Sequence, residues 1–324
     1  MITVTVAVLT YNPDKEKLLA TLGSVLLQKK VAFEVVIADD GSARKCFDDV
    51  RELFAEQGFS DYRIVENSEN RGTVYNTKSA VAAARGKYVK LISPGDMLNG
   101  NDILHNWAET MEASGAVLSF ADAVYYAPTE NGLQAVVANA NPSQVSCYEK
   151  ADWEQGRYNY LICDDLFLGA ATMCLREKLA DYLEEIAGKV IYAEDNVYRL
   201  MAYDRVPVCY FRETAIIYET GLGVSTSGNS VWSKRLLDDW NACSQMLIKR
   251  CSGQDPIDKK LLCLLKRKPD NLIKKLLLHI RVPGLLFFKL RNKISRRKTE
   301  NVLPQEFLRQ VMPDRLEGEN TDGH

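Results

Sequence analysis

The sequence predicts an α/β fold with a mostly parallel, Rossmann-like central sheet, helices on both faces of the sheet and a helical C-terminal extension. Three observations support this prediction. Apolar, β-branched runs alternate with segments of helical periodicity from residue 4 to residue 92. Several of these runs end in polar residues and glycine, as strands do at the ligand-binding edge of a parallel sheet. Beyond residue 229 the apolar residues follow a helical period.

The first part of the chain contains four predicted strands. We expect them at 4–9, 33–38, 62–65 and 87–92. Between them, helical spacing appears over 18–26, 48–57 and 74–85, and Gly86 is a typical helix stop. One more helix, marked by Ile103, Leu104, Trp107 and Met111, precedes a strand at 116–120.

The second part is less regular. We expect residues 121–160 to be irregular, with short antiparallel strands, followed by helices at 179–187 and 194–203 and strands at 208–211 and 215–218. A flexible loop at 221–228 leads to a long amphipathic helix from Trp232 to Leu247, and the tail from Glu300 is polar. We therefore divide the chain into 1–98, 99–228 and 229–324, the first two being halves of one domain.

Charge is distributed unevenly along the chain. The net charge is -2, but residues 266–298 contain twelve Lys or Arg and one acid, so this segment carries about +11 and the rest about -13. The first strand starts so near residue 1 that we expect no signal peptide, and no apolar run is long enough for a membrane span. The eight cysteines lack CxxC spacing, which disfavours a zinc site or a disulfide framework.

Polar side chains follow two of the predicted strands. Asp39 and Asp40 end the second strand before Gly41-Ser42, and Thr10-Tyr11-Asn12 ends the first. An aspartate at such a position can simply cap the next helix. A pair of carboxylates beside a matching Tyr-Asn end instead favours a ligand site outside the carboxyl ends of the strands.

Two further acidic positions are candidates. Asp96 follows the fourth strand in a Ser-Pro-Gly-Asp turn that aims it at the same edge, although it also suits an ordinary turn. Glu194-Asp195 starts a predicted helix, where acids commonly serve as caps. Two adjacent acids still leave one carboxylate available for chemistry.

Several enzyme classes lack their sequence signatures here. No GxGxxG follows a strand, and no GxxxxGK[ST] motif occurs, which disfavours nicotinamide, flavin and P-loop enzymes. The three histidines (His105, His279, His324) show no triad or metal spacing.

In combination, these motifs resemble family 2 glycosyltransferases of the GT-A fold, the type that builds bacterial surface polysaccharides. The resemblance covers about residues 2–230. The matching segments, in order, are Thr10–Asn12, Leu22–Gln28, Phe33–Ser42, Asn70–Gly72 with Asn76, Gly86–Tyr88 leading to Asp96, Gly169–Met173 and Glu194-Asp195. Each motif is weak alone, but their order and spacing together are specific.

The resemblance implies a role for each motif. Thr10, Tyr11, Asn12 and Asp40 would bind the nucleoside of a nucleotide sugar, with Asp39 in support, and Arg71 and Lys78 would lie near the nucleotide or its diphosphate. Asp96 would hold Mn²⁺ or Mg²⁺. Asp195, beside Glu194, would be the general base. By the same resemblance, 1–98 is the nucleotide-sugar half and 99–228 the acceptor half of the domain.

One motif departs from the family pattern. The family usually has aspartates where this chain has Ser93 and Gly95, so only Asp96 remains of the metal motif. One carboxylate together with a diphosphate and water is still enough for a divalent ion.

The resemblance implies an inverting glycosyltransferase of hexosyl or N-acetylhexosaminyl type. It would move a sugar from a UDP-sugar to a hydroxyl of a saccharide or lipid-linked acceptor during surface-polysaccharide synthesis. Two alternatives stay open: a non-catalytic nucleotide-sugar-binding or scaffold protein at the membrane, and a sugar-phosphate nucleotidyltransferase. Tyr11-Asn12-Pro13 argues against the latter, which needs a glycine-rich basic loop at that position.

The basic segment 266–298 interleaves Leu and Phe with Lys and Arg. A basic amphipathic helix of this kind fits the surface of an anionic membrane. Alternatively, its leucines dock on the catalytic domain. We expect no nucleic-acid partner, because no aromatic platform or motif accompanies the charge. The expected location is cytoplasmic, with peripheral contact at the inner face of the cell membrane.

Overall fold

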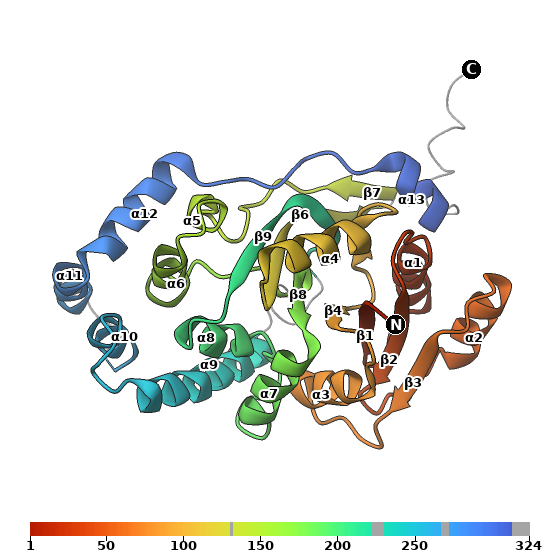
Figure 1. The fold of residues 1–324 in the computed structure, drawn as a ribbon, viewed down its shortest axis with the longest axis horizontal. Helices are drawn as coiled ribbons and strands as arrows, with labels where there is room; N and C mark the ends of the chain where they lie inside the picture. Colours follow the sequence, from red (N-terminus) through yellow and green to blue (C-terminus); the bar gives the residue numbers. More distant parts are fainter. Residues whose placement is uncertain (130–131, 222–229, 267–271, 313–324) are drawn as a thin grey trace.

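The structure, a computed structural model, describes residues 1–129, 132–221, 230–266 and 272–312, without the side chains of residues 230 and 272–275. The predicted loop at 222–228 and the last part of the polar tail lie outside the described residues. A single sheet runs through the middle of the molecule, with helices around it (Figure 1). The fold class predicted from the sequence is therefore confirmed.

The sheet has the strand order β3-β2-β1-β4-β8-β6-β9-β5, with β7 paired to β6. Its first four members are parallel, β8 is antiparallel to both neighbours, and β6 and β9 run parallel to each other. The strands are β1 (Val4–Thr10), β2 (Phe33–Asp39), β3 (Tyr62–Glu66), β4 (Tyr88–Ile92), β5 (Met97–Leu98), β6 (Leu118–Thr129), β7 (Gly132–Ala135), β8 (Thr172–Leu175) and β9 (Val208–Glu219).

Helices cover the sheet and extend beyond it. Around the sheet lie α1 (Lys15–Leu26), α2 (Phe47–Glu56), α3 (Thr73–Ala83), α4 (Ile103–Ser114), α5 (Ser146–Glu149), α6 (Trp153–Ile162), the short 3₁₀ helix η1 (Gly169–Ala171), α7 (Arg176–Ile186) and α8 (Asn196–Tyr203). The C-terminal region adds α9 (Ser230–Arg250), α10 (Asp258–Leu265), α11 (Leu272–Arg281), α12 (Pro283–Ser295) and α13 (Gln305–Val311). Among the described residues, no helix is long and apolar enough to cross a membrane.

The central strand β1 shows why the fold forms. All of its residues are buried, as expected for a parallel strand covered on both faces. Val4, Val6 and Val8 point to the core that contains α1, α2 and α4, while Ala7 and Leu9 point to the core that contains α3, α7 and α8. Because successive side chains alternate between faces, one apolar run supplies both cores.

The second part of the chain differs from the sequence prediction in three places. The strand predicted at 116–120 continues to Thr129, and the strands predicted at 208–211 and 215–218 form one strand, β9. The polar residues 212–214 resemble a turn, but the strand passes through them with a register shift against β6. The segment 121–160, which we expected to be irregular, contains α5 and nearly all of α6.

A buried carboxylate fixes the start of β4 against β1 and β2. Glu34 has no exposed surface and accepts hydrogen bonds from the Thr5 hydroxyl, the Arg85 backbone N–H and the Arg85 guanidinium. Burial alone would raise the pKa of Glu34, but these donors outweigh it and lower the pKa. The Thr5 hydroxyl in turn accepts from the Gly86 N–H at 2.9 Å, so β1, β2 and the turn before β4 are held together.

We predict that Glu34→Ala lowers the free energy of unfolding by about 2–4 kcal/mol, because buried donors lose a charged acceptor. Arg85 is half-exposed and can regain water, which limits the loss. Urea unfolding with Glu56→Ala, on the exposed last turn of α2, as the control measures the difference. Equal stability of the two variants would contradict this role for Glu34.

Candidate active site

Asp39 is fully buried at the end of β2, and its carboxylate organises the ends of two strands. It accepts hydrogen bonds from the Thr10 hydroxyl at 2.9 Å, the Ser42 hydroxyl at 2.5 Å and the Ser42 N–H at 2.8 Å. Thr10 ends β1, so Asp39 ties the carboxyl ends of β1 and β2 to the turn that follows β2.

Asp40 reaches in the opposite direction, to the loop before α3. One carboxylate oxygen accepts the Arg71 N–H at 3.0 Å and the other accepts the Gly72 N–H at 2.8 Å. Burial raises the pKa of Asp40, although these two N–H donors oppose the shift. The carboxylate therefore positions the Asn70–Gly72 turn, and each oxygen keeps the capacity for a further hydrogen bond.

The Asn70–Gly72 turn is also in close contact with the turn before α8. Gly72 has a φ of +92°, and a Cβ at this position would lie 2.6 Å from the carbonyl oxygen of Ile191. The Val74 N–H donates to that carbonyl at 3.0 Å. Only glycine combines this backbone conformation with this approach. Asp40 is thus linked, through Gly72 and Ile191, to the segment that carries Glu194 and Asp195.

The other predicted donor-site residues occupy different settings. Tyr11 is exposed, and Asn12 accepts the Ala43 and Arg44 N–H groups with its side-chain oxygen, so Asn12 shapes the turn after β2. The exposed Arg71 guanidinium lies over the ring of Tyr75, at 3.5 Å from its centroid. Lys78 forms an ion pair with Glu184 on α7, so this geometry does not bring its ammonium to the other candidates.

A third buried carboxylate, Asp239 on α9, holds the turn before α8. It accepts the backbone N–H groups of Ile191, Tyr192 and Ala193 at 2.7–2.9 Å. Asp195 makes no side-chain hydrogen bond to the first turn of α8, so it does not cap that helix. Asp195 is an exposed residue at a turn whose backbone Asp239 holds in place.

Both acids at this turn have raised pKa values. Burial and the neighbouring Asp195 raise the pKa of Glu194 well above its ordinary value. Burial raises the pKa of Asp195 as well, while Arg199 opposes the shift. Asp195 is the more exposed residue of the two, and Arg199 favours its charged form, so Asp195 is the better candidate for a base and Glu194 the better candidate to hold a proton.

The predicted acceptor segment meets this turn. Gly169, at the start of η1, faces Asp195: a Cβ there would lie 3.6 Å from the Asp195 Cβ. Thr172 bonds the Tyr198 hydroxyl at 2.8 Å, which fixes η1 on α8. The structure thus brings together two segments that lie 26 residues apart in the sequence.

Asp96 is buried beside Glu219, the last residue of β9. The Glu219 N–H donates to Asp96 at 3.1 Å, and the Glu219 carboxylate accepts from the Lys17 ammonium at 2.6 Å. Gly95 has a φ of +103°, and a Cβ there would lie 2.3 Å from a carboxylate oxygen of Glu219. Glu219 therefore fills the space that a side chain at position 95 needs.

Lys90, in the middle of β4, is fully buried between η1 and the turn that carries Asp96. Its ammonium donates to the carbonyls of Leu91 and of Ala170 in η1. Burial lowers the pKa of Lys90 to about 7, against the opposing effect of Asp96. Burial raises the pKa of Asp96 to about 7, against the Glu219 N–H and Lys90. Lys90 supports η1, and its charge lies near Asp96.

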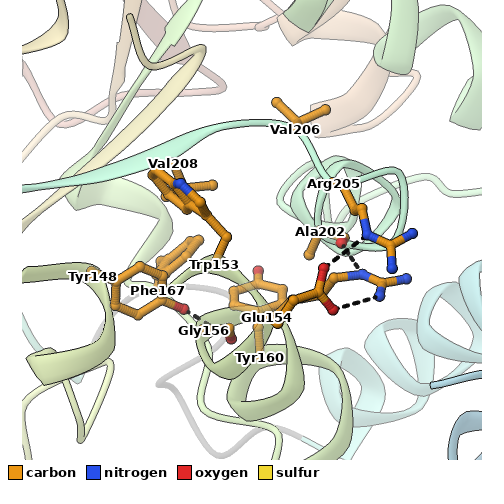
Figure 2. A pocket seen from close by; sticks show the side chains of 11 residues that line it. Tyr148, Trp153, Glu154, Gly156, Tyr160, Phe167, Ala202, Arg205, Val206 and Val208 are labelled. Atoms are coloured by element: carbon orange, nitrogen blue, oxygen red, sulfur yellow. Dashed lines mark hydrogen bonds and ion pairs between the residues drawn. The ribbon is translucent and has the colours of Figure 1, made fainter. Parts of the chain in front are cut away.

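A small cavity of about 30 Å³ lies elsewhere, between α6, α8 and β9 (Figure 2). Trp153, Tyr160 and Phe167 line it, and Glu154 closes one side through an ion pair with Arg205. This volume holds a water molecule but not a sugar. The cavity is therefore not the candidate active site.

Comparison with protein families agrees with this geometry. Residues 5–158 match the model described as glycosyl transferase family 2. This part of the chain, slightly less than half of it, is similar to that family. The family and the fold together support a glycosyltransferase. A comparison with curated proteins gives no match.

Solved glycosyltransferases share the GT-A fold of this chain. The S. aureus TarS 1-349 structure in complex with UDP is 14% identical, with a TM-score of 0.56 over 98% of this chain and 82% of that chain. The mannosyltransferase PcManGT from Pyrobaculum calidifontis, in complex with GDP-Man and Mn²⁺, is 16% identical, with a TM-score of 0.54 over 98% and 87%. Both comparisons span the C-terminal helices as well as the sheet.

Four polar residues near the candidate site escaped the sequence reasoning: Lys17, Lys90, Glu219 and Asp239. Lys90 gave a usable signal, because a lysine inside an apolar strand requires partners. Glu219 ends a strand that we predicted to end one residue earlier. Asp239 and Lys17 occupy ordinary polar positions of amphipathic helices, which carry no such signal.

We predict that the free energy of unfolding of the wild type rises between about pH 7 and pH 10, relative to that of Lys90→Met. Neutral Lys90 is the folded form above about pH 7, whereas an unfolded lysine stays protonated up to about 10.5. Folding then releases a proton, worth at most about 1.4 kcal/mol per pH unit. Urea unfolding across this range tests it, with Lys150→Met on the surface as control. Parallel pH profiles of wild type and Lys90→Met would refute the buried-ammonium argument.

Proposed function

We propose that this protein is an inverting glycosyltransferase that moves a sugar from a UDP-sugar to a hydroxyl of a saccharide or lipid-linked acceptor in cell-surface polysaccharide synthesis. The observation that carries the proposal is the contact chain from Asp40 through Gly72 to Ile191, which joins the strand ends to the turn bearing Asp195. A donor bound at the strand ends would then lie near a solvent-accessible carboxylate. This arrangement fits transfer of a hexosyl or N-acetylhexosaminyl group.

The ligands bound in similar structures support the choice of donor. TarS 1-349 was crystallised with UDP and with UDP-GlcNAc, and PcManGT with GDP-Man. In this chain we assign nucleoside contact to the exposed Tyr11 ring and the free lone pairs of Asp40. Thr10, Asn12 and Asp39 keep the strand ends in place, and Arg71 is close enough to Asp40 to meet the nucleotide or its diphosphate.

The residues at Asp96 fit a divalent ion, Mn²⁺ or Mg²⁺. Asp96 and Glu219 place two carboxylates side by side. The described residues contain no group of three acidic, His or Cys side chains suited to a metal. Two carboxylates suffice when a diphosphate and water complete the coordination. When bound, the ion would neutralise negative charge on the leaving diphosphate.

The proposed reaction is a single displacement at the anomeric carbon. Asp195 takes the proton of the acceptor hydroxyl as its oxygen bonds to the anomeric carbon, and the nucleoside diphosphate leaves from the opposite face. Asp239 holds the turn, so the Asp195 carboxylate meets the acceptor without first ordering its backbone. Glu194, with its raised pKa, adds little negative charge beside the base.

We predict that a UDP-sugar raises the melting temperature and that Mn²⁺ increases this shift, because ligands that bind only the folded state stabilise it. In Asp96→Asn the Mn²⁺ increment should disappear while the nucleotide effect remains. Asp48→Asn, on the exposed face of α2, is the matched control. A screen in which no nucleotide sugar changes the melting temperature would count against the proposal.

For Asp195→Asn we predict unchanged donor binding and a turnover reduced about a hundredfold or more, the usual effect of removing a general base. The measurements are donor-induced thermal shift and UDP release. Asp181→Asn, on the exposed side of α7, controls for loss of surface charge. Near-full turnover in Asp195→Asn would refute the assignment. Absence of UDP release from wild type would favour a non-catalytic binding protein instead.

A further inference from the structure

The basic segment contains a concentration of exposed apolar side chains. Of the fifteen large apolar residues that are exposed in the described part of the chain, seven lie between residues 276 and 294. We call them the apolar stripe: Leu276, Leu277, Ile280, Leu286, Phe287, Leu290 and Ile294. Single exposed apolar residues are ordinary, whereas a contiguous group marks an interaction surface.

Helix α12 is docked on the domain by its opposite face. Val282 and Leu285 are buried in the core, and Asn292 exchanges hydrogen bonds with Ser143 and Gln144. The alternative that this segment docks on the domain is therefore confirmed for these residues. The membrane alternative stays a prediction, and other apolar residues of the segment face solvent. The side chains of Leu272 and Ile273 lie outside the described ones. The docking fixes the helix and leaves the apolar stripe outside.

The exposed residues of α12 occupy one side of the helix. At about 100° per residue, Leu286, Leu290 and Ile294 fall within about 80°, and Phe287 lies next to them. Around the helix axis, Lys293 lies about 20° beyond Leu286 on one edge of this side, and Arg291 lies about 60° beyond Ile294 on the other. In α11 the same spacing places Leu276, Leu277 and Ile280 together, followed by Arg281. An apolar stripe between basic edges is the pattern of a helix that lies in a membrane interface.

The charges of this surface are available to a partner. Among the described residues, Arg281, Lys289, Arg291 and Lys293 form no ion pair, and residues 272–298 contain no acidic residue. Arg297 differs, because it is engaged with Asp122 in the domain. Unpaired basic groups beside exposed leucine and phenylalanine complement an anionic headgroup above an acyl layer. In Figure 1, α11 and α12 lie at the outer edge of the molecule, opposite α2.

We propose that α11 and α12 form a peripheral docking surface for an anionic lipid bilayer, with the apolar stripe inserted among the acyl chains and the flanking lysines and arginines at the headgroups. The inference does not depend on the sugar-transfer reaction, since it rests on the C-terminal helices alone. Such binding weakens with salt, because part of it is electrostatic, and also weakens when the inserted apolar area is reduced.

The test is co-sedimentation of the full chain with vesicles of phosphatidylcholine alone or mixed with phosphatidylglycerol. Wild type should bind the mixed vesicles and not the neutral ones. Phe287→Ser/Ile294→Ser should reduce binding at least about tenfold, since these side chains are 70% and 88% exposed and contribute to insertion rather than folding. Val137→Ser/Val302→Ser, also exposed but away from the stripe, should bind as wild type.

A second pair of variants tests the electrostatic contribution to vesicle binding. Lys289→Glu/Lys293→Glu reverses two charges beside the apolar stripe, and the control Lys29→Glu/Lys150→Glu changes the net charge equally. Only the first variant should lose binding at low salt. Equal binding by stripe variants and controls, or no binding of wild type to anionic vesicles, would overturn the proposal. A wild-type dimer that becomes monomeric in Phe287→Ser/Ile294→Ser, without vesicle binding, would identify the surface as a self-association interface instead. Donor-induced thermal shifts should be the same in all variants.

Discussion

The close approach of Gly72 to Ile191 is the constraint on which the rest of the site depends. It requires a glycine with a positive φ, and the Asp40 carboxylate holds that glycine by its N–H. On the other side, Asp239 holds Ile191 and the two residues after it. Two buried carboxylates therefore act on backbone groups from opposite sides of one contact. These contacts fix the position of the turn that carries Asp195 relative to the ends of β1 and β2.

Near Asp96, the absence of a side chain at Gly95 is matched by the position of the Glu219 carboxylate. A glycine at position 95 permits the positive φ of the turn and leaves space for the Glu219 carboxylate. Glu219 is balanced by Lys17, and Lys90 adds a buried positive charge near Asp96. The space that a side chain at position 95 would need is thus filled by a carboxylate from a strand more than a hundred residues away.

The acids of this site differ in proton affinity because their environments differ. Glu194 and Asp96 lie among protein atoms that disfavour their charged forms, whereas Asp195 is reached by water. Asp39 and Asp40 use their oxygens on backbone and hydroxyl donors, which suits recognition and support. In the proposed function, the same residue type would serve structural, recognition and catalytic roles, each in a different environment.

The sequence by itself determined the alternation of strands and helices, the parallel edge and most of the residues at it, because these signals are local: β-branched runs, helical periods and polar strand ends. It also predicted the basic C-terminal segment. Only the tertiary structure decided that residues 208–219 form one strand, that Asp239, Glu219 and Lys90 join the site, and which leucines of α11 and α12 remain exposed. These outcomes depend on contacts between residues far apart in the chain, such as Glu219 with Asp96 or Asp239 with Ile191. A helix position on its own does not reveal which neighbour will cover it, and neither composition nor periodicity encodes that pairing.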